Sequence, residues 1–444
     1  MTQEKIYDII GIGIGPFNLS MACLANPVKD LNTLFFDRSD RFDWHPGMMM
    51  QDTTLQIPFM ADLVTMADPT SEFTFLNYIK EKRRIYSFYI RENFYLLRNE
   101  YNQYCQWAIE KLDNLRFSHN VEDIMYDEEQ EIYLVKVYNK TEDTVESYRT
   151  RKIVLGTGTT PYMPSFFHPI KDLAVHSSEY LYKKKELQSR KAITIIGSGQ
   201  SAAEIYYDLL QEIDVYGYEL NWITRSTHFF QMEYNKLTLE LTSPEYVDYF
   251  YNLPAEKRRA LLKNQNSLYK GINESLINDI FDLLYTKRLT ADIKTNLLTN
   301  SECVGAKYTK QGIIDLEFYH SEQEESFHFE TDGLVLCTGY KYRLPAFLDG
   351  INDRIDWKST EKFNVQRNYS IDKNANEIFV QNAELETHGF VTPDLGMGCY
   401  RNSYILREIT GRDIYPVEQQ IAFQKFGVYE NLTKAQQYET STSK

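Results

Sequence analysis

The chain has few cysteines, and none of them form a close pair. Five cysteines stand far apart along 444 residues, at Cys23, Cys105, Cys303, Cys337 and Cys399. Because the sequence has no CxxC pair, it argues against a disulfide reductase and against a cysteine-ligated zinc site. Scattered single cysteines are typical of proteins in a reducing compartment.

The chain also lacks an excess of positive charge and a long apolar run. Its formal net charge is −15 at pH 7, which argues against nucleic acid as a partner. No apolar run approaches the ~20 residues that a membrane span needs, and the first residues show no signal-peptide pattern. We therefore expect a cytoplasmic protein. A hydrophobic fraction of 43% with 25% charged residues is typical of a globular chain, here with two or three domains.

What the sequence does contain is a strand, a glycine turn and a helix at its start. The apolar run at 6–10 predicts a buried strand, and 17–24 has a helical pattern. A second strand, at 33–36, ends in an acid. This order is the dinucleotide-binding layout. The residues assigned to this first site are Gly11, Gly13, Gly15, Pro16 and Asp37.

Each of these residues has a physical task in that layout. Gly11 allows the tight turn, and Gly13 lets the backbone approach a pyrophosphate, whose charge the helix N-terminus can bind. Pro16 replaces the usual third glycine and suits a first helical turn. Asp37 is placed to accept a hydrogen bond from a ribose hydroxyl. The alternative is an ordinary strand-to-helix turn, but the strand context and the spaced acid favour a nucleotide site.

A second unit of the same kind begins at residue 192. A strand at 192–196 leads into a glycine turn and a helix, and the next strand, 220–224, ends in Arg225 instead of an acid. An arginine there suits a 2′-phosphate and favours NADPH over NADH, although a simple surface arginine is the alternative. The residues assigned to this second site are Gly197, Ser198, Gly199, Gln200, Ser201 and Arg225.

Two such units in one chain imply hydride transfer from NADPH to FAD. We expect an α/β fold with two Rossmann-like dinucleotide-binding domains and a small helical substrate-binding insert. The predicted limits are 1–189 and 336–444 for a discontinuous FAD domain, 190–228 and 295–335 for the NADPH domain, and 229–294 for the insert. Within the first domain, residues 68–71 predict a turn and an N-cap before a helix at 73–79. The pattern of residues 112–137 is typical of a small β-meander. We expect the tail from residue 434 to be frayed.

Several motifs, in this order and spacing, resemble one family. It is that of the N-hydroxylating flavin monooxygenases of siderophore biosynthesis, which act on lysine, ornithine or aliphatic diamines. The matching stretches are residues 11–19 (GIGIGPFNL), 42–48 (FDWHPGM), 62–70 (DLVTMADPT), 75–78 (FLNY), 156–158 (GTG), 176–178 (HSS), 197–204 (GSGQSAAE), 337–340 (CTGY) and 382–389 (NAELETHG).

The resemblance implies a reaction and further site residues. NADPH would reduce FAD, reduced flavin would take up O2 as a C4a-hydroperoxide, and a neutral primary amine would attack its distal oxygen while NADP+ stays bound. The protein would supply orientation, dryness and hydrogen bonds. The resemblance places Gln56 beside the isoalloxazine as the catalytic residue. It adds as cofactor-binding residues Trp44, His45, Thr338, Gly339, Tyr340, His388 and Gly389.

Two departures from the family concern the substrate. Ala61 stands where the amino-acid hydroxylases carry a lysine that pairs with the substrate carboxylate, and an alanine cannot replace that donor. Leu239, before Glu240, occupies a second polar position, whereas Asn273 matches a family substrate-side asparagine. A site that keeps the amine end and loses the carboxylate clamp fits putrescine or cadaverine. Lysine, ornithine and histamine remain alternatives, since another basic residue can meet a carboxylate.

The remaining expectations are coarser. The resemblance implies a homo-oligomer, a dimer or tetramer, whose product feeds a hydroxamate siderophore, with no metal and no membrane contact. Diamine length leaves little trace in a sequence, because one methylene is worth only ~1–3 kcal/mol in an apolar pocket. The rival interpretations are another two-dinucleotide flavoenzyme, such as a disulfide reductase, and a non-catalytic NADPH- or redox-sensing flavoprotein.

Overall fold

The computed structural model describes residues 5–428, so the tail that was predicted to be frayed from residue 434 lies outside the described residues. The first sheet is built on the N-terminal strand. The strand order is β5-β2-β1-β8-β7-β6, with β21 beside β8. Only β6, β7 and β8 pair antiparallel, as a meander. The strands are β1 (Ile6–Ile12), β2 (Thr33–Phe36), β5 (Leu115–Arg116), β6 (His119–Asp127), β7 (Ile132–Asn139), β8 (Thr144–Leu155) and β21 (Ile378–Val380). The strands expected near 6–10 and 33–36 are confirmed, whereas the meander expected at 112–137 runs over 119–155.

Helices from both ends of the chain cover one face of this sheet. They are α1 (Pro16–Ala25), α4 (Arg98–Glu110) and α13 (Gly398–Thr410), and they share one apolar core, to which Leu19, Tyr104 and Ile405 belong. Alternate strand residues such as Ile10 and Ile153 face a second core, because successive side chains of a strand point to opposite faces. The C-terminal segment is therefore part of the first domain.

The second sheet is wholly parallel, in the order β10-β17-β11-β12-β13. Three helices pack on one face through residues such as Leu209 and Leu284, and a small antiparallel sheet covers the other through Leu316 and Phe318. The strands are β10 (Ala174–His176), β11 (Ala192–Ile196), β12 (Glu219–Ile223), β13 (Thr295–Leu298) and β17 (Gly333–Leu336); the helices are α5 (Tyr180–Gln188), α6 (Gln200–Gln211) and α11 (Glu274–Thr290); the small sheet is β14 (Ser301–Tyr308), β15 (Ile314–His320) and β16 (Glu325–Thr331). The fold is thus α/β with two Rossmann-like units.

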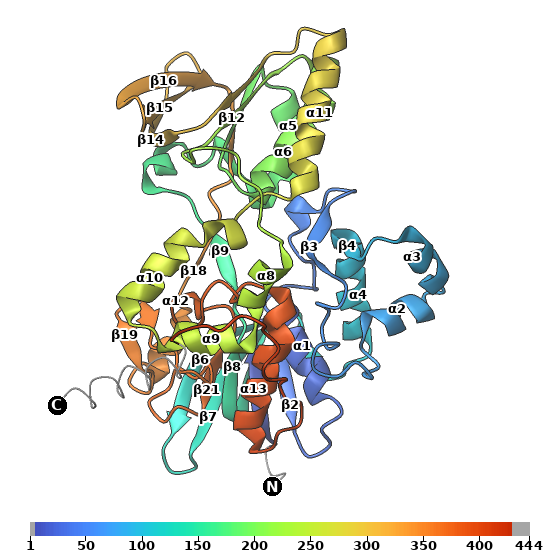
Figure 1. Cartoon of the computed structure of the whole chain (residues 1–444). Helices are drawn as coiled ribbons and strands as arrows, with labels where there is room; N and C mark the ends of the chain where they lie inside the picture. The colour runs from blue at the N-terminus through green and yellow to red at the C-terminus, as the bar shows by residue number, and fades with distance from the viewer. Residues whose placement is uncertain (1–4, 429–444) are drawn as a thin grey trace, which may run out of the picture.

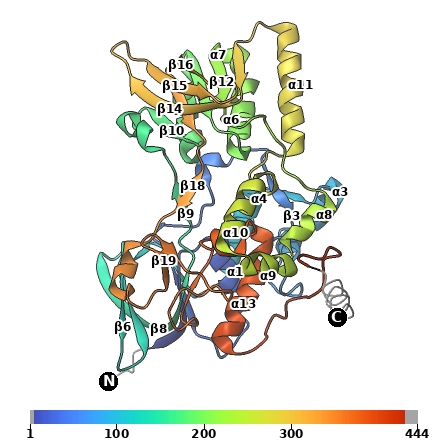
Figure 2. The same ribbon diagram turned by 60° about the vertical axis from the view of Figure 1, so that its left-hand side comes forward.

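The two units stand one above the other, joined by a narrow ribbon (Figure 1). The ribbon pairs β9 (Thr159–Pro161) antiparallel with β18 (Tyr340–Tyr342), and Figure 2 shows it between the two halves from a second side. Among residues 5–428, no helix is long and apolar enough to cross a membrane.

Two segments pack against a different unit from the one that the predicted domain limits assign to them. Strand β10 and helix α5 precede residue 189, yet β10 pairs with β17 of the second sheet. Within 229–294, helix α11 packs against α6, whereas α9 (Pro244–Asn252) and α10 (Ala255–Asn264) pack against α12 (Leu385–His388) of the first unit. The helical segment is therefore divided between both units. A three-residue strand such as β10 carries too little periodicity to be assigned to a sheet from sequence.

The predicted helix start near residue 71 is wrong by a few positions. Helix α2 (Phe75–Glu81) begins after Thr74, whose hydroxyl oxygen accepts a hydrogen bond from the Asn77 amide at 3.2 Å. Asp68 instead closes a turn by accepting from the Thr70 amide. Both residue types are good N-caps, so the hydrogen-bonded turn at 68–71 concealed the true boundary.

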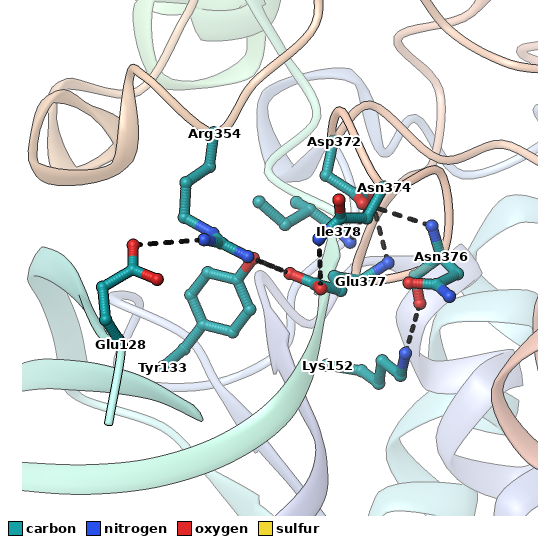
Figure 3. A network of polar contacts seen from close by, with 9 residues as sticks. All are labelled: Glu128, Tyr133, Lys152, Arg354, Asp372, Asn374, Asn376, Glu377 and Ile378. Atoms are coloured by element: carbon teal, nitrogen blue, oxygen red, sulfur yellow. Dashed lines mark hydrogen bonds and ion pairs between the residues drawn. The ribbon is translucent and has the colours of Figure 1, made fainter. Parts of the chain in front are cut away.

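A polar network holds β21 in the first sheet (Figure 3). Glu377 accepts hydrogen bonds from the Tyr133 hydroxyl at 2.5 Å and from Arg354 at 2.8 Å. The Asp372 carboxylate accepts from the amides of Glu377 and Ile378 at 2.9 and 2.8 Å. These contacts fix the loop before β21, and with it the register that pairs Ile378 with Ile153.

Candidate active site

The first glycine loop admits only glycine at two positions. A Cβ on Gly11 would lie 2.1 Å from the Phe35 ring. Gly13 has φ +89°, and a Cβ there would lie 2.4 Å from the Gly156 carbonyl oxygen. This close approach of the backbone is the feature that lets a pyrophosphate reach the loop.

The helix that follows presents a free N-terminus. Gly15 is the N-cap of α1, Pro16 is its first residue, and no described side chain caps it. A Cβ on Gly15 would meet none of the described atoms within 4 Å. Uncapped amides facing open space form an anion site, so the structure fits the phosphates of a dinucleotide here.

Asp37 lies at the end of β2, as the sequence predicts. One carboxylate oxygen accepts from the Ile14 amide and the other from the Ser39 amide, both at 2.7 Å. These bonds fasten the carboxylate against the glycine loop. Each oxygen retains a lone pair, which is the arrangement a ribose hydroxyl needs.

The second glycine loop repeats these features. Gly197 has φ +145°, and a Cβ there would lie 2.5 Å from the Cys337 carbonyl oxygen. Gly199 is the N-cap of α6, again without a described side-chain cap. Ser198 and Ser201 are half-buried beside it. Arg225 follows β12 with 78% of its side chain exposed and only a 3.5 Å contact to Glu302, so its guanidinium is open to an anion.

Three residues predicted for three different roles meet between the units. Gln56 on β3 (Thr54–Pro58) donates from Nε2 to the Gln200 carbonyl oxygen at 3.2 Å. The same oxygen accepts from the Asn273 backbone amide at 2.8 Å. The predicted catalytic, NADPH-side and substrate-side residues therefore form one cluster.

A buried ion pair stands behind this cluster. Gln200 Nε2 donates to the Glu204 carboxylate at 2.8 Å, and the Arg98 guanidinium donates to both oxygens of Glu204 at 2.6 and 2.8 Å. Burial raises the pKa of Glu204, while Arg98 and Gln200 oppose the shift. Arg98 begins α4 of the first unit and Glu204 lies on α6 of the second, so the pair joins the two units.

Tyr234 completes the cluster. Burial raises the pKa of its phenol to about 12, a shift that the neighbouring Gln56 and Asn273 side chains oppose. Its buried hydroxyl has no hydrogen-bond partner of ordinary geometry among the described residues. A backbone bridge fixes its loop, since the Met232 amide donates to the Ile272 carbonyl at 2.8 Å. An orphaned hydroxyl beside two amides is suited to a bound polar group.

Aromatic rings gather around His45, beside the first residue of β18. The His45 ring lies edge-on between Trp44 and Tyr340, with centroids 5.2 and 5.7 Å away. Desolvation and the charge of Arg98 lower the pKa of His45 to about 4, so its imidazole is neutral at pH 7. The Gly339 carbonyl accepts from His176 at 3.1 Å, and the Thr338 hydroxyl donates to the Tyr162 carbonyl. The two predicted stretches, 44–45 and 338–340, thus lie together.

His388 has a packing role. Its ring stacks on Tyr369 with centroids 4.3 Å apart, and its nitrogens are hydrogen-bonded to the Arg367 carbonyl and the Thr387 hydroxyl at 3.1 and 2.9 Å. Burial lowers the pKa of His388 to about 3. With both nitrogens bonded inside the protein, only the backbone of the following Gly389, at φ +86°, is left for a cofactor.

The two departures in the substrate region lie apart. Ala61 is 8% exposed, and the Asp62 carboxylate fixes its segment by accepting from the Val64, Thr65 and Phe75 amides at 2.7–2.9 Å. Leu239 ends α8 (Lys236–Leu239) with 48% exposure. The adjacent Glu240 accepts from the amides of Phe423 and Gln424 at 2.9 Å, so this corner contacts the C-terminal segment.

Three members of the cluster were not predicted from the sequence. Glu204 stood inside a quoted motif, GSGQSAAE, without a role, whereas Arg98 and Tyr234 carried no local signal. Their importance arises from contacts over long separations, 106 positions for Arg98 and Glu204.

Comparison with known proteins agrees with this geometry. A family model described as L-lysine 6-monooxygenase/L-ornithine 5-monooxygenase matches residues 5–342. The chain is 54% identical over 425 residues to a putrescine N-hydroxylase of Shewanella oneidensis, covering 96% of this chain and 85% of the relative.

Two solved structures are similar over nearly the whole chain. One is DfoA of Erwinia amylovora bound to FAD, a cadaverine monooxygenase of the desferrioxamine biosynthetic pathway, with 55% identity, TM-score 0.94 and coverage of 96% and 99% of the two chains. The other is the ornithine N-hydroxylase KtzI of Kutzneria sp. 744 with reduced FAD, NADP+ and L-ornithine, with 25% identity, TM-score 0.84 and coverage of 92% and 99%.

Proposed function

Because the chain belongs to the L-lysine 6-monooxygenase/L-ornithine 5-monooxygenase family, we propose that it is an FAD-dependent monooxygenase that uses NADPH and O2. Its reaction is N-hydroxylation of one primary amine of an aliphatic diamine, putrescine or cadaverine. The observation that carries the proposal is the hydrogen bond from Gln56 to Gln200, because it joins the flavin-side strand to the start of the second dinucleotide helix.

The residues present fit both cofactors. The loop 11–16 and Asp37 would hold FAD, and the loop 197–201 with Arg225 would hold NADPH. Both helices have a glycine at the N-cap and no described side chain that caps their first amides, which leaves those amides free for phosphate. When bound, FAD supplies the two-electron chemistry with NADPH and O2.

The chain's own residues orient the reactants and exclude water. The Gln56 and Asn273 amides and the Tyr234 hydroxyl provide fixed polar groups at the meeting point of the two units. The rings of Trp44 and Tyr340 flank His45 and add apolar surface near Arg98, whose charge acts on His45. A water-poor site with pre-oriented hydrogen-bonding groups is what an uncharged amine nucleophile needs.

The surroundings of Ala61 support a diamine. Ala61 and Asp394 both lie beside Gly396. A Cβ added to Gly396 would lie 3.6 Å from the Ala61 Cβ and 3.2 Å from a carboxyl oxygen of Asp394. The family lysine is thus replaced by a small side chain with a carboxylate nearby. Burial raises the pKa of Asp394, but a nearby ammonium group favours its ionised form. An ionised Asp394 attracts the second ammonium of a diamine and repels the carboxylate of lysine or ornithine.

A substrate panel tests this function. Purified enzyme with FAD is assayed for NADPH consumption and hydroxylamine formation with putrescine, cadaverine, histamine, ornithine and lysine. We expect coupled hydroxylation of the two diamines and poor kcat/KM for the amino acids. Comparable kcat/KM for lysine contradicts the diamine assignment, and NADPH oxidation without hydroxylamine from any amine contradicts the monooxygenase.

We further propose a cytoplasmic homo-oligomer, a dimer or tetramer, that serves hydroxamate siderophore synthesis. One helix supports association, since Phe281, Tyr285 and Leu289 line α11 at i, i+4 spacing and are each more than 60% exposed. Exposed apolar stripes of this kind are typical of interfaces. Light scattering of the wild type and of Tyr285→Glu tests it, and a wild-type monomer contradicts it.

A further inference from the structure

Hydrogen bonds link four side chains in a row, and the donor and acceptor of each bond fix those of the next. The four are Arg98, Glu204, Gln200 and Gln56. An amide side chain has a donor end and an acceptor end, whereas an ionised carboxylate only accepts. The Arg98 guanidinium donates to both oxygens of Glu204. Such a two-pronged pairing favours the ionised carboxylate.

The direction of Gln200 follows from this carboxylate. Its NH2 group has to face Glu204, where it donates at 2.8 Å. Its carbonyl oxygen therefore has to face the opposite way, where it accepts from the Asn273 amide at 2.8 Å. A backbone N–H group can only donate, so Glu204 and the Asn273 amide require the same orientation of the Gln200 side-chain amide.

Gln56 is the next link. Because the Gln200 oxygen only accepts, Gln56 has to offer its NH2 group, at 3.2 Å. The carbonyl oxygen of Gln56 then points away from Gln200. Tyr234, whose buried hydroxyl has no hydrogen-bond partner of ordinary geometry among the described residues, lies close to the side chains of Gln56 and Asn273.

We propose that Arg98 and Glu204 are positioning residues that orient the Gln200 and Gln56 amides, so that Gln56 presents a hydrogen-bond acceptor to the group bound between the units. An acceptor at this place recognises an N–H or O–H donor on that group. The same chain of bonds joins α4 and β3 of the first unit to α6 and the start of α11 of the second, so one ion pair aligns both halves of the site. This inference rests on the proposed function only for what Gln56 faces.

Two variants break the chain at different links. Glu204→Gln keeps the size of the side chain but adds a donor, so Gln200 is no longer held in one direction. Gln200→Leu removes the link itself. The matched control is Glu212→Gln, at the exposed end of the same helix, where Glu212 pairs with Lys184 at 2.8 Å.

The first readout needs no cofactor. Hydrogen–deuterium exchange of the apoprotein follows the Asn273 amide, whose acceptor is the Gln200 oxygen. We expect exchange at Asn273 to be about fivefold faster in Glu204→Gln and Gln200→Leu, the factor for one ordinary hydrogen bond, and unchanged in Glu212→Gln. Wild-type protection in both variants overturns the proposal, and the second variant decides if the first does not fold.

The second readout is coupling in the loaded enzyme. Hydroxylamine formed per NADPH is measured with putrescine, and we expect it to fall in Glu204→Gln and Gln200→Leu but not in the control. If the wild type hydroxylates and Glu204→Gln couples equally well, the positioning role is overturned. If the wild type hydroxylates no amine, the proposed function fails, and the exchange result alone decides the orienting chain.

Discussion

Tyr133 and Glu377 lie 244 positions apart in the chain and share a hydrogen bond of 2.5 Å. Burial opposes ionisation of Glu377, but hydrogen bonds from Tyr133, Arg354 and Asn374 outweigh it and lower the pKa of this carboxyl. The contact fastens the late strand β21 into the sheet begun by the first residues (Figure 3).

A charge-removing substitution at Glu377 should therefore destabilise the protein in a pH-dependent way. A lowered folded-state pKa contributes stability above the unfolded pKa of ~4.3, and that contribution is lost as pH falls through the folded value. We expect Glu377→Gln to cost about 1–3 kcal/mol at pH 7, with a smaller difference near pH 4. Urea unfolding measures it, with the exposed Glu129→Gln as control; an equal cost at both pH values contradicts the prediction.

Two glycines of the first loop should respond differently to alanine. Gly13→Ala forces a side chain onto φ +89° and against the Gly156 carbonyl, so we expect about 1–3 kcal/mol of destabilisation of the apoprotein. Gly15→Ala meets open space, so the apoprotein should keep its stability while FAD binds more weakly. Thermal unfolding and FAD titration separate the two effects. Equal stability loss in both variants contradicts the assignment of the open space to a ligand.

Gln56→Ala should uncouple NADPH oxidation from hydroxylation. The substitution removes both the donor to Gln200 and the amide that faces the bound group, so water and misoriented substrate are less well excluded. We expect hydrogen peroxide in place of hydroxylamine at a similar rate of NADPH oxidation. Peroxide and hydroxylamine assays check it, and unchanged coupling counts against the role of Gln56.

Arg225→Ala should discriminate between the two nicotinamide cofactors. We expect the exposed guanidinium to contact the 2′-phosphate that only NADPH carries. Loss of a charge-assisted contact of ~1.5–3 kcal/mol raises the KM for NADPH roughly tenfold or more, with little change for NADH. Steady-state kinetics with both cofactors test this. An equal change in the KM for NADPH and the KM for NADH contradicts a contact between Arg225 and the 2′-phosphate.

Ala61→Lys should restore a carboxylate clamp. A lysine at this buried position brings a positive charge near the Asp394 carboxylate and repels the second ammonium of a diamine. We expect kcat/KM for putrescine to fall and that for ornithine to rise relative to it. Ala61→Met, similar in length but uncharged, is the control. A loss of the same size with methionine would show that space, not charge, decides.

The two glycine loops and their strands could be read from sequence because their signals are local. Gly13 and Gly197 both have a positive φ, a local backbone conformation that favours glycine, and the strand before each loop is a continuous apolar run. The structure places Asp37 and Arg225 at the strand ends where the sequence expected them. Their contacts with nucleotides stay predictions.

The centre of the site could not be read in the same way. The ion pair of Arg98 with Glu204 depends on how two sheets are placed relative to each other, and no local pattern encodes that placement. His388, which was assigned to a cofactor from its motif, has a ring that is buried against Tyr369, a packing contact that no local pattern indicates; its contact with a cofactor stays a prediction. Division of the helical segment between the units also depends on packing, since α9 and α11 have similar local patterns but different neighbours.

The ribbon of β9 and β18 has a mechanical consequence. A ribbon of two three-residue strands can take a larger twist than a wide sheet, so by itself it constrains rotation of one half against the other only weakly. The Arg98–Glu204 pair belongs to other elements, α4 and α6, and therefore opposes that rotation at a separate point. A rotation that separates α4 from α6 requires this ion pair to open, so an electrostatic contact resists rotation of one half against the other.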